Sequence, residues 1–210
     1  VMFGDEMINE ASRKIALKFI SRGGRAGLIA ANNLTKRFDA LLFDAGGVFV
    51  VPDPLTTGMV LEPFGGTTSL GTLVRCHYAG MAAIDEATAI QSASSIERIS
   101  WSSYRQAYAR EAGVPEKKVV EAAEALLKVF SAFLWRFPLH ESVAGLWRLH
   151  MLGVRIGIVS NASGQIEQTL ANENVCQVGD GAGVPVFIVT DSHVVGVAKP
   201  EPQIFDEAIR

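Results

Sequence analysis

The chain has 210 residues, of which 49% are hydrophobic and 20% are charged, with a formal net charge of -3 and a mean hydropathy of +0.24. This composition excludes disordered and collagen-like chains, and the nearly balanced charge argues against a dedicated nucleic-acid binder. No segment approaches the roughly 18 uninterrupted apolar residues of a membrane span, so we expect a soluble protein.

Residues 1–38 differ from the rest and are interpreted as an N-terminal extension with a basic middle and several glycines. A helix is expected over residues 9–20. Lys14 and Lys18 interrupt the apolar run that a signal peptide would need. We therefore expect a surface helix or a disordered leader rather than a targeting segment.

Three short apolar runs, at residues 40–43, 154–159 and 184–189, each end in polar residues and predict buried strands. Between the second and third runs, residues 164–172 predict a helix. Strand, helix and strand in succession indicate a parallel sheet, whose ligands bind beyond the carboxyl ends of the strands. The polar residues that follow the strands are therefore the candidates for chemistry.

The stretch between the first two strands is predicted to be a helical insertion, with helices at 82–93, 96–112 and 116–135. A further helix, at 141–151, leads back to the sheet. Three aromatic residues of the insertion, Trp101, Tyr104 and Tyr108, fall at helical spacing, which predicts a packing stripe between helices.

The segments that follow the strands are FDAGGV at 43–48, VSN at 159–161 and AKPEP at 198–202. In this order they resemble the first three motifs of the haloacid dehalogenase superfamily of hydrolases. The resemblance implies an α/β fold in which a three-layer, Rossmann-like parallel sheet carries an inserted helical cap. The expected division is an extension at 1–38, a core at 39–54 and 138–210, and a cap at 55–137.

Asp44, at the tip of a strand, can act as a nucleophile and form an aspartyl ester or an aspartyl phosphate. Two like unit charges 4 Å apart repel by roughly 4 kcal/mol at an effective dielectric constant near 20, so an anionic substrate needs a compensating cation. Lys199 supplies that charge and keeps Asp44 ionised. The resemblance adds Mg²⁺ as the cofactor, held by Asp44 and the backbone carbonyl of Gly46.

Four further residues are predicted to bind the substrate. Ser160 would donate its hydroxyl group to a substrate oxygen, and Asn161 would orient it. The backbone N–H groups exposed by Gly46 and Gly47 would surround an anion. Arg75, in a polar cluster of the insertion, is a candidate carboxylate or phosphate clamp, with a surface helix as the alternative interpretation.

Two features depart from the family pattern. In its phosphatases the second residue after the nucleophile is usually an aspartate, the general acid and base, but here it is Gly46, a loss typically worth about 10²- to 10⁴-fold in rate. Only residues 200–210 follow Lys199, enough for a helix predicted over 201–209 but too few for the family's fourth, acidic motif, which completes the magnesium site. From this we expect the C-terminal part of the core to be missing.

The first functional hypothesis is a magnesium-dependent small-molecule phosphatase. The second is metal-independent dehalogenation of a small halogenated acid, which Gly46 favours, although family dehalogenases normally carry an aromatic residue there. The third is a truncated or catalytically weak member that acts as a binding protein.

The expected partner is a small-molecule phosphate or another anionic substrate, with neither nucleic acid nor membrane. An unpaired edge of the last strand predicts self-association through that edge. The two cysteines, Cys76 and Cys176, form neither a disulfide framework nor a metal-ligand pair, which suits a reducing cytoplasm.

Overall fold

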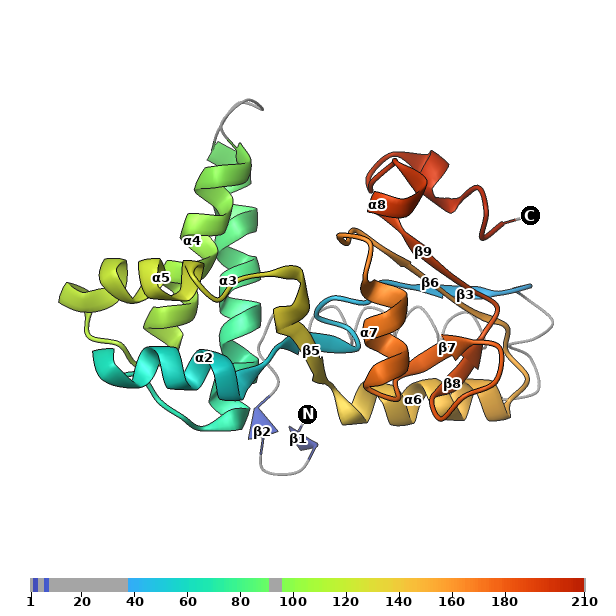
Figure 1. The fold of residues 1–210 in the computed structure, drawn as a ribbon, viewed down its shortest axis with the longest axis horizontal. Coiled ribbons are helices and arrows are strands. Elements are labelled where there is room, and N and C mark those ends of the chain that lie inside the picture. The colour runs from blue at the N-terminus through green and yellow to red at the C-terminus, as the bar shows by residue number, and fades with distance from the viewer. Residues whose placement is uncertain (1, 4–5, 8–37, 91–95, 210) are drawn as a thin grey trace.

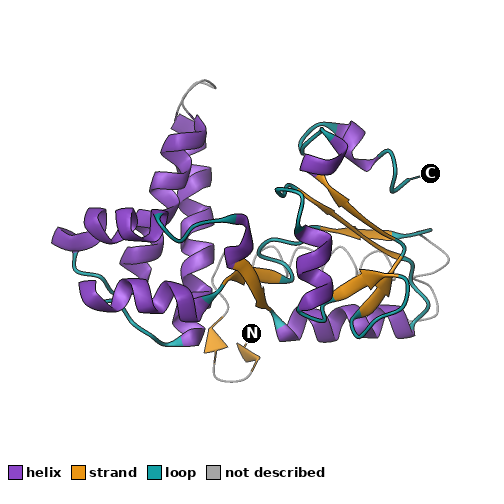
Figure 2. Cartoon of the chain, in the orientation of Figure 1, coloured by secondary structure: helices purple, strands orange, loops and turns teal. Residues whose placement is uncertain are grey.

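The computed structural model describes residues 2–3, 6–7, 38–90 and 96–209. The helix predicted over residues 9–20 lies outside this described part. Figure 1 shows a helical part and a sheet part joined by β4 and β5, and Figure 2 shows that the second part combines strands with helices.

The strands are β1 (Met2–Phe3), β2 (Glu6–Met7), β3 (Leu41–Phe43), β4 (Val50–Pro52), β5 (Trp135–Pro138), β6 (Ile156–Ser160), β7 (Cys176–Val178), β8 (Val184–Val186) and β9 (Ile188–Asp191). The α-helices are α2 (Pro54–Leu61), α3 (Leu70–Ile90), α4 (Ile96–Glu111), α5 (Val119–Leu127), α6 (His140–Met151), α7 (Ile166–Asn172) and α8 (Ser192–Val195). Short 3₁₀ helices are η2 (Glu62–Phe64), η3 (Glu116–Lys118), η4 (Ala132–Leu134) and η5 (Pro202–Phe205).

The central sheet has the order β3-β6-β9, and both of its strand pairs are parallel. Its middle strand, β6, is buried along its whole length. One face of β6 packs through Ile158 against Leu146 of α6 and Leu170 of α7, and the other packs through Val159 against Ile204. The predicted α/β class with a parallel sheet is confirmed.

The prediction of one strand over residues 184–189 was wrong, because two strands, β8 and β9, occupy this segment. β8 pairs with β7, whereas β9 pairs with β6, and the chain changes partner at Phe187. Pro185 lies in β8 and has no N–H group to give to a second neighbour, which restricts this part of the segment to pairing on one side. Strand β7 had no counterpart among the predicted elements.

Two predicted helices are shorter than expected. The helix predicted over 116–135 ends at Leu127 in the structure, after which the chain passes through η4 into β5. The helix predicted over 201–209 is reduced to the 3₁₀ turn η5, whose Ile204 is buried against the sheet. In both places the chain follows tertiary packing rather than its helix propensity.

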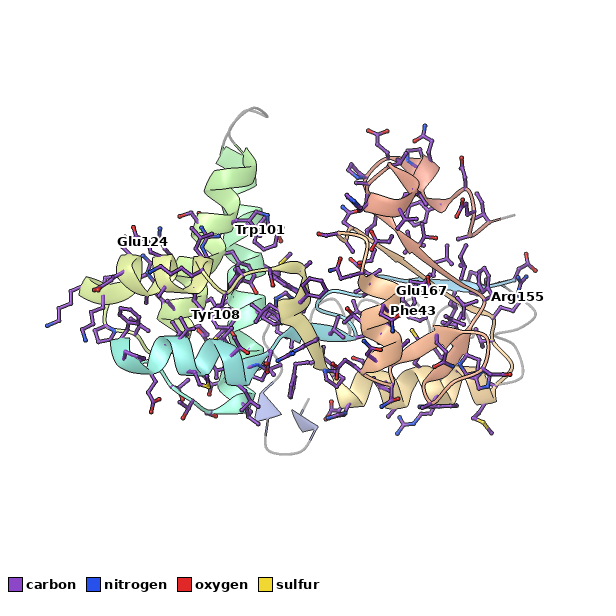
Figure 3. All side chains as sticks on the ribbon, in the orientation of Figure 1. Phe43, Trp101, Tyr108, Glu124, Arg155 and Glu167 are labelled. Atoms are coloured by element: carbon purple, nitrogen blue, oxygen red, sulfur yellow. The ribbon has the colours of Figure 1, made fainter. Side chains whose placement is uncertain are left out.

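The helical part has a hydrophobic core of its own, formed by α2, α3, α4 and α5. Tyr104 and Tyr108 are fully buried in it, while Trp101 is 36% exposed, so the predicted packing stripe is confirmed. Trp101 and Tyr108 are labelled in the helical part in Figure 3, and Phe43 is labelled in the sheet part. Gly80 makes room for this packing, because a Cβ atom there would lie 2.5 Å from the Tyr104 ring.

The antiparallel pair of β4 and β5 joins the two parts, and an ion pair fixes its end. Asp53 caps α2 by accepting from the Leu55 N–H, and its Oδ2 accepts from Arg136 Nη2 at 2.9 Å. Burial alone would raise the pKa of Asp53. The hydrogen bonds from Arg136, Thr56 and Leu55 outweigh it and hold that pKa below its ordinary value.

Within the described ranges no helix is both long enough and apolar enough to cross a membrane. Cys76 and Cys176 are free thiols, and burial raises the pKa of each to about 12. The cytoplasmic location and the self-association through a sheet edge stay predictions.

Gly80→Ala should destabilise the protein by about 1–3 kcal/mol, because the added methyl group overlaps the Tyr104 ring. Gly145→Ala is the matched control, since Gly145 also lies in a helix but a Cβ there would meet no atom within 4 Å. It should stabilise the protein by about 0.5–1 kcal/mol, through helix propensity. Urea unfolding measures the free energy of unfolding of both variants, and equal changes in the two would contradict the packing argument.

Asp53→Asn should lower the free energy of unfolding at neutral pH, and this difference from the wild type should disappear in acid. Because the folded-state pKa of Asp53 is lowered, its contribution is complete above the ordinary value of 3.8 and is lost as pH falls through the lower, folded-state pKa. Thermal unfolding between pH 7 and pH 2 measures the gap. Glu116→Gln is the control, because the Arg110–Glu116 pair is exposed and should matter little at any pH.

Candidate functional site

An ion pair between Asp44 and Lys199 lies at the centre of the candidate site. Asp44 comes directly after β3, and Lys199 follows α8. Lys199 Nζ lies 2.8 Å from Asp44 Oδ2 and also donates to the carbonyl oxygen of Val159 at 3.0 Å. The Asp44 side chain is 46% exposed, so its carboxylate is accessible to a ligand.

In the turn after Asp44, one backbone N–H group has no acceptor among the described residues. The Ala45 carbonyl accepts from the N–H groups of residues 48–50, and the Gly47 N–H donates to Val50. The Ala45 N–H donates to Asp44 Oδ1 at 2.7 Å. Among the described residues, the Gly46 N–H has no acceptor. The anion cradle predicted from Gly46 and Gly47 is therefore reduced to the Gly46 N–H.

Asn161 positions Lys199 through its side-chain amide. Asn161 Nδ2 donates to the Lys199 carbonyl at 3.0 Å, and Asn161 Oδ1 accepts from the Lys199 N–H at 2.7 Å. Both polar ends of the amide are thus in use.

Ser160, at the end of β6, is 3% exposed, and its hydroxyl group has no hydrogen-bond partner in the described part of the chain. Ser160 is therefore the freer donor.

Asp191 was not selected from the sequence, although it ends a predicted strand. Its Oδ2 accepts from the Gly164 and Ile166 N–H groups at 2.9 and 3.3 Å, and its Oδ1 accepts from the His193 N–H at 2.9 Å. Asp191 thereby joins the loops that follow β6 and β9. In the sequence Asp191 is only a carboxylate after a strand, and an ordinary helix N-cap residue shows the same pattern.

The polar cluster at residues 75–78 contacts the turn that follows Asp44 through residues other than Arg75. Arg75 donates to Thr72, one turn earlier in α3. Tyr78 donates its hydroxyl hydrogen to the Gly47 carbonyl at 3.0 Å, and the His77 ring lies where a Gly47 side chain would be. The contact between cap and turn therefore comes from His77 and Tyr78.

Trp135 of β5 lies beside Gly46. A Cβ atom built on Gly46 would be 3.9 Å from Trp135 Cδ1 and 4.0 Å from Trp135 Nε1. Position 46, where the sequence resemblance led us to expect an aspartate in a phosphatase, thus faces an indole ring. No local pattern of residues predicts this contact, because 89 positions separate the two residues (135 − 46).

The described residues do not fit a magnesium site. Asp44 is the single carboxylate at the ion pair, and its two oxygens already accept hydrogen bonds from Ala45 and Lys199. No group of three or more His, Cys, Asp or Glu side chains suited to a metal occurs in the described ranges. Magnesium takes six near-octahedral oxygen ligands, several of which are usually water, and one carboxylate already engaged by Lys199 and the Ala45 N–H is a poor basis for such a site.

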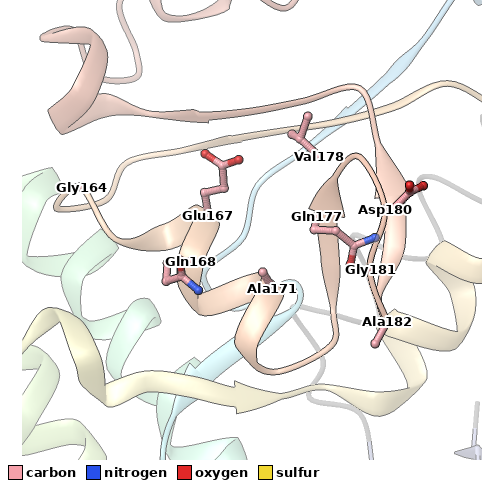
Figure 4. Close-up of a pocket in the computed structure, with 9 residues that line it drawn as sticks. All are labelled: Gly164, Glu167, Gln168, Ala171, Gln177, Val178, Asp180, Gly181 and Ala182. Carbon is pink, nitrogen blue, oxygen red and sulfur yellow. The ribbon is translucent and has the colours of Figure 1, made fainter.

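A cavity of about 390 Å³ lies elsewhere, between α7 and the loop after β7 (Figure 4). Its lining includes Glu167 and Asp180 but neither Asp44 nor Lys199. Asp180 belongs to the VGDG segment at 178–181, which superficially resembles the family's acidic motif. The cavity is therefore separate from the candidate site.

Asn161→Ala should lower turnover about 100-fold, because Lys199 loses the two hydrogen bonds that fix its backbone. In a Lys199→Ala background the same change should cost little, since Asn161 acts through Lys199. Steady-state rates of the four proteins measure this coupling. Ser163→Ala, an exposed neighbour, should leave the rate unchanged. An equal loss in both backgrounds would contradict the positioning role.

No family model and no curated protein matches the chain. Solved structures do match it. An L-2-haloacid dehalogenase matches at 21% identity with a TM-score of 0.36, covering 82% of this chain and 70% of that one. The L-2-haloacid dehalogenase of Xanthobacter autotrophicus matches at 20% identity with a TM-score of 0.37, covering 81% and 63%. A further dehalogenase matches at 15% identity with a TM-score of 0.41, covering 83% and 71%. All three of these likenesses lie below 25% sequence identity.

Proposed function

We propose that the chain is a hydrolase of the haloacid dehalogenase-like superfamily that works through a covalent ester on Asp44. Its proposed substrates are small halogenated carboxylic acids, and its proposed reaction needs no metal. The observation that carries this proposal is the glycine at position 46, which faces the Trp135 indole and provides no acid.

The nature of the leaving group explains why position 46 matters. An alkoxide leaving from a phosphate ester is strongly basic and needs a proton from a general acid, which typically contributes about 10²- to 10⁴-fold in rate. A halide ion is a very weak base and leaves without a proton. Displacement of halide from carbon therefore suits a site with a nucleophile and no neighbouring acid.

In the first step one oxygen of Asp44 attacks the carbon that carries the halogen. A carbon–oxygen bond forms, the carbon–halogen bond breaks, and the halide leaves with the bonding electron pair. Lys199 Nζ, 2.8 Å from Asp44 Oδ2, places a positive charge beside the attacking carboxylate. The Gly46 N–H and the Ser160 hydroxyl group are the free donors for the substrate carboxylate.

In the second step water attacks the carbonyl carbon of the ester. The hydroxy acid leaves, the Asp44 carboxylate is restored, and one proton passes to solvent. Lys199 and the Gly46 N–H would stabilise the negative charge that develops on the ester oxygen. Each turnover thus consumes one water and releases one halide ion and one proton.

A phosphomonoesterase is the second candidate, and the Lys199 ammonium group favours it. A cation beside the nucleophile offsets the repulsion between Asp44 and a phosphate dianion. This reaction would depend on a source of protons other than residue 46. The two candidates share the Asp44 nucleophile and differ in the leaving group and in the need for a metal.

Purified protein should release halide from bromoacetate or 2-chloropropionate in the presence of EDTA. Asp44→Asn should lower this rate at least about 10³-fold, because the amide is not a nucleophile. Ion chromatography of halide measures the rate, and circular dichroism verifies folding. Asp180→Asn is the matched control, since Asp180 lies in the wall of the separate cavity, and its rate should equal that of the wild type.

Two other results would change the proposal. Halide release that survives Asp44→Asn would overturn the covalent route. Phosphate release from an aryl phosphate that needs both Mg²⁺ and Asp44, without halide release, would replace the proposal with the second candidate.

A further inference from the structure

His77 is the feature of the cap that the proposed reaction has not used. It lies in α3, is 3% exposed, and packs against the turn that carries the nucleophile. A Cβ atom built on Gly47 would lie 2.7 Å from His77 Nε2. The His77 ring thus takes the place of a side chain at residue 47, three positions after Asp44.

The other ring nitrogen of His77 is paired with Tyr104. The distance between His77 Nδ1 and the Tyr104 hydroxyl oxygen is 2.8 Å. Burial lowers the pKa of His77 to about 4, so its ring is neutral and carries one N–H at neutral pH. Burial also raises the pKa of Tyr104 well above its ordinary value, so the phenol keeps its hydrogen.

The Tyr104 hydroxyl group determines which nitrogen of His77 carries the hydrogen. Tyr104 is fully buried, and His77 Nδ1 is the single acceptor for its hydrogen among the described residues. A buried hydroxyl hydrogen without an acceptor is costly. The phenol therefore donates to Nδ1, and the ring hydrogen lies on Nε2, the nitrogen that faces the Gly47 turn.

His77 Nε2 has no hydrogen-bond partner in the described part of the chain. Nε2 is not among the fully buried unpaired side-chain atoms of the described residues, so an external acceptor can reach it beside the turn that follows Asp44. The Gly46 N–H in the same turn is also free. Two unpaired donors, one from the cap and one from the core, thus flank the turn that follows Asp44.

We propose that His77 is a substrate-binding residue whose Nε2–H, together with the Gly46 N–H, donates to an anionic oxygen of the substrate. The acceptor is a carboxylate or phosphate oxygen. This inference extends the proposed function by giving the cap a role in anion recognition. It also accounts for Gly47, because any side chain there would displace the ring.

The experiment measures anion binding to the full chain, independently of turnover. Isothermal titration with glycolate and with inorganic phosphate gives the Kd of each anion. His77→Leu should weaken binding of the recognised anion roughly tenfold, as expected for loss of one hydrogen bond to a charged group. His77→Gln, whose amide N–H reaches the place of Nε2, should bind within about threefold of the wild type.

Tyr78→Phe is the matched control. It removes a hydrogen bond to the Gly47 carbonyl from the same turn of α3 but takes no donor from the anion, so its Kd should stay near that of the wild type. Tyr104→Phe should weaken binding, because the ring can then place its hydrogen on Nδ1. Spectra of protein with ¹⁵N-labelled histidine should show protonated Nε2 in the wild type, with the His77 signal identified by its loss in His77→Gln.

Equal Kd values for the wild type and a folded His77→Leu variant would overturn the inference. Protonated Nδ1 in the wild type, or no binding of either anion, would do the same. A tenfold loss of affinity in a protein that releases no halide would support the inference and reject the dehalogenase proposal. The anion that binds more tightly identifies the substrate oxygen as carboxylate or phosphate.

Discussion

The site depends on holding one ammonium group beside one carboxylate at the end of a parallel sheet. Lys199 Nζ contacts Asp44 Oδ2 and the Val159 carbonyl, while Asn161 fixes the Lys199 backbone from both sides. The ion pair is only partly buried, so its direct contribution to stability is small. Its value is chemical, because a nucleophilic carboxylate must be ionised and must tolerate an approaching anion.

The glycines after Asp44 link the core to the cap. Gly46 leaves its N–H free and faces Trp135, and Gly47 leaves room for the His77 ring and accepts from Tyr78 through its carbonyl. Cap residues thus occupy space that side chains of the turn would otherwise fill. A turn without side chains allows a separate domain to supply the chemical groups around the nucleophile.

Much of the core followed from sequence patterns. The apolar runs before Asp44 and Ser160 became β3 and β6, and because parallel strands end at one edge, their polar neighbours met there. Predictions failed where packing opposed local preference. The segment at 184–189 changed partner at Phe187. Residues 128–134 left the predicted helix and lead through η4 into β5, which pairs with β4.

The sequence by itself determined the parallel α/β core, the helical insertion and the residues at the strand ends, because hydrophobic periodicity and strand polarity are local properties. Only the tertiary structure decided that His77, Tyr78 and Trp135 rather than Arg75 meet the nucleophile turn. Those contacts join residues from 30 to 89 positions apart, His77 with Gly47 and Trp135 with Gly46. Such proximity arises from the packing of whole helices and strands. The local sequence around each residue does not predict it.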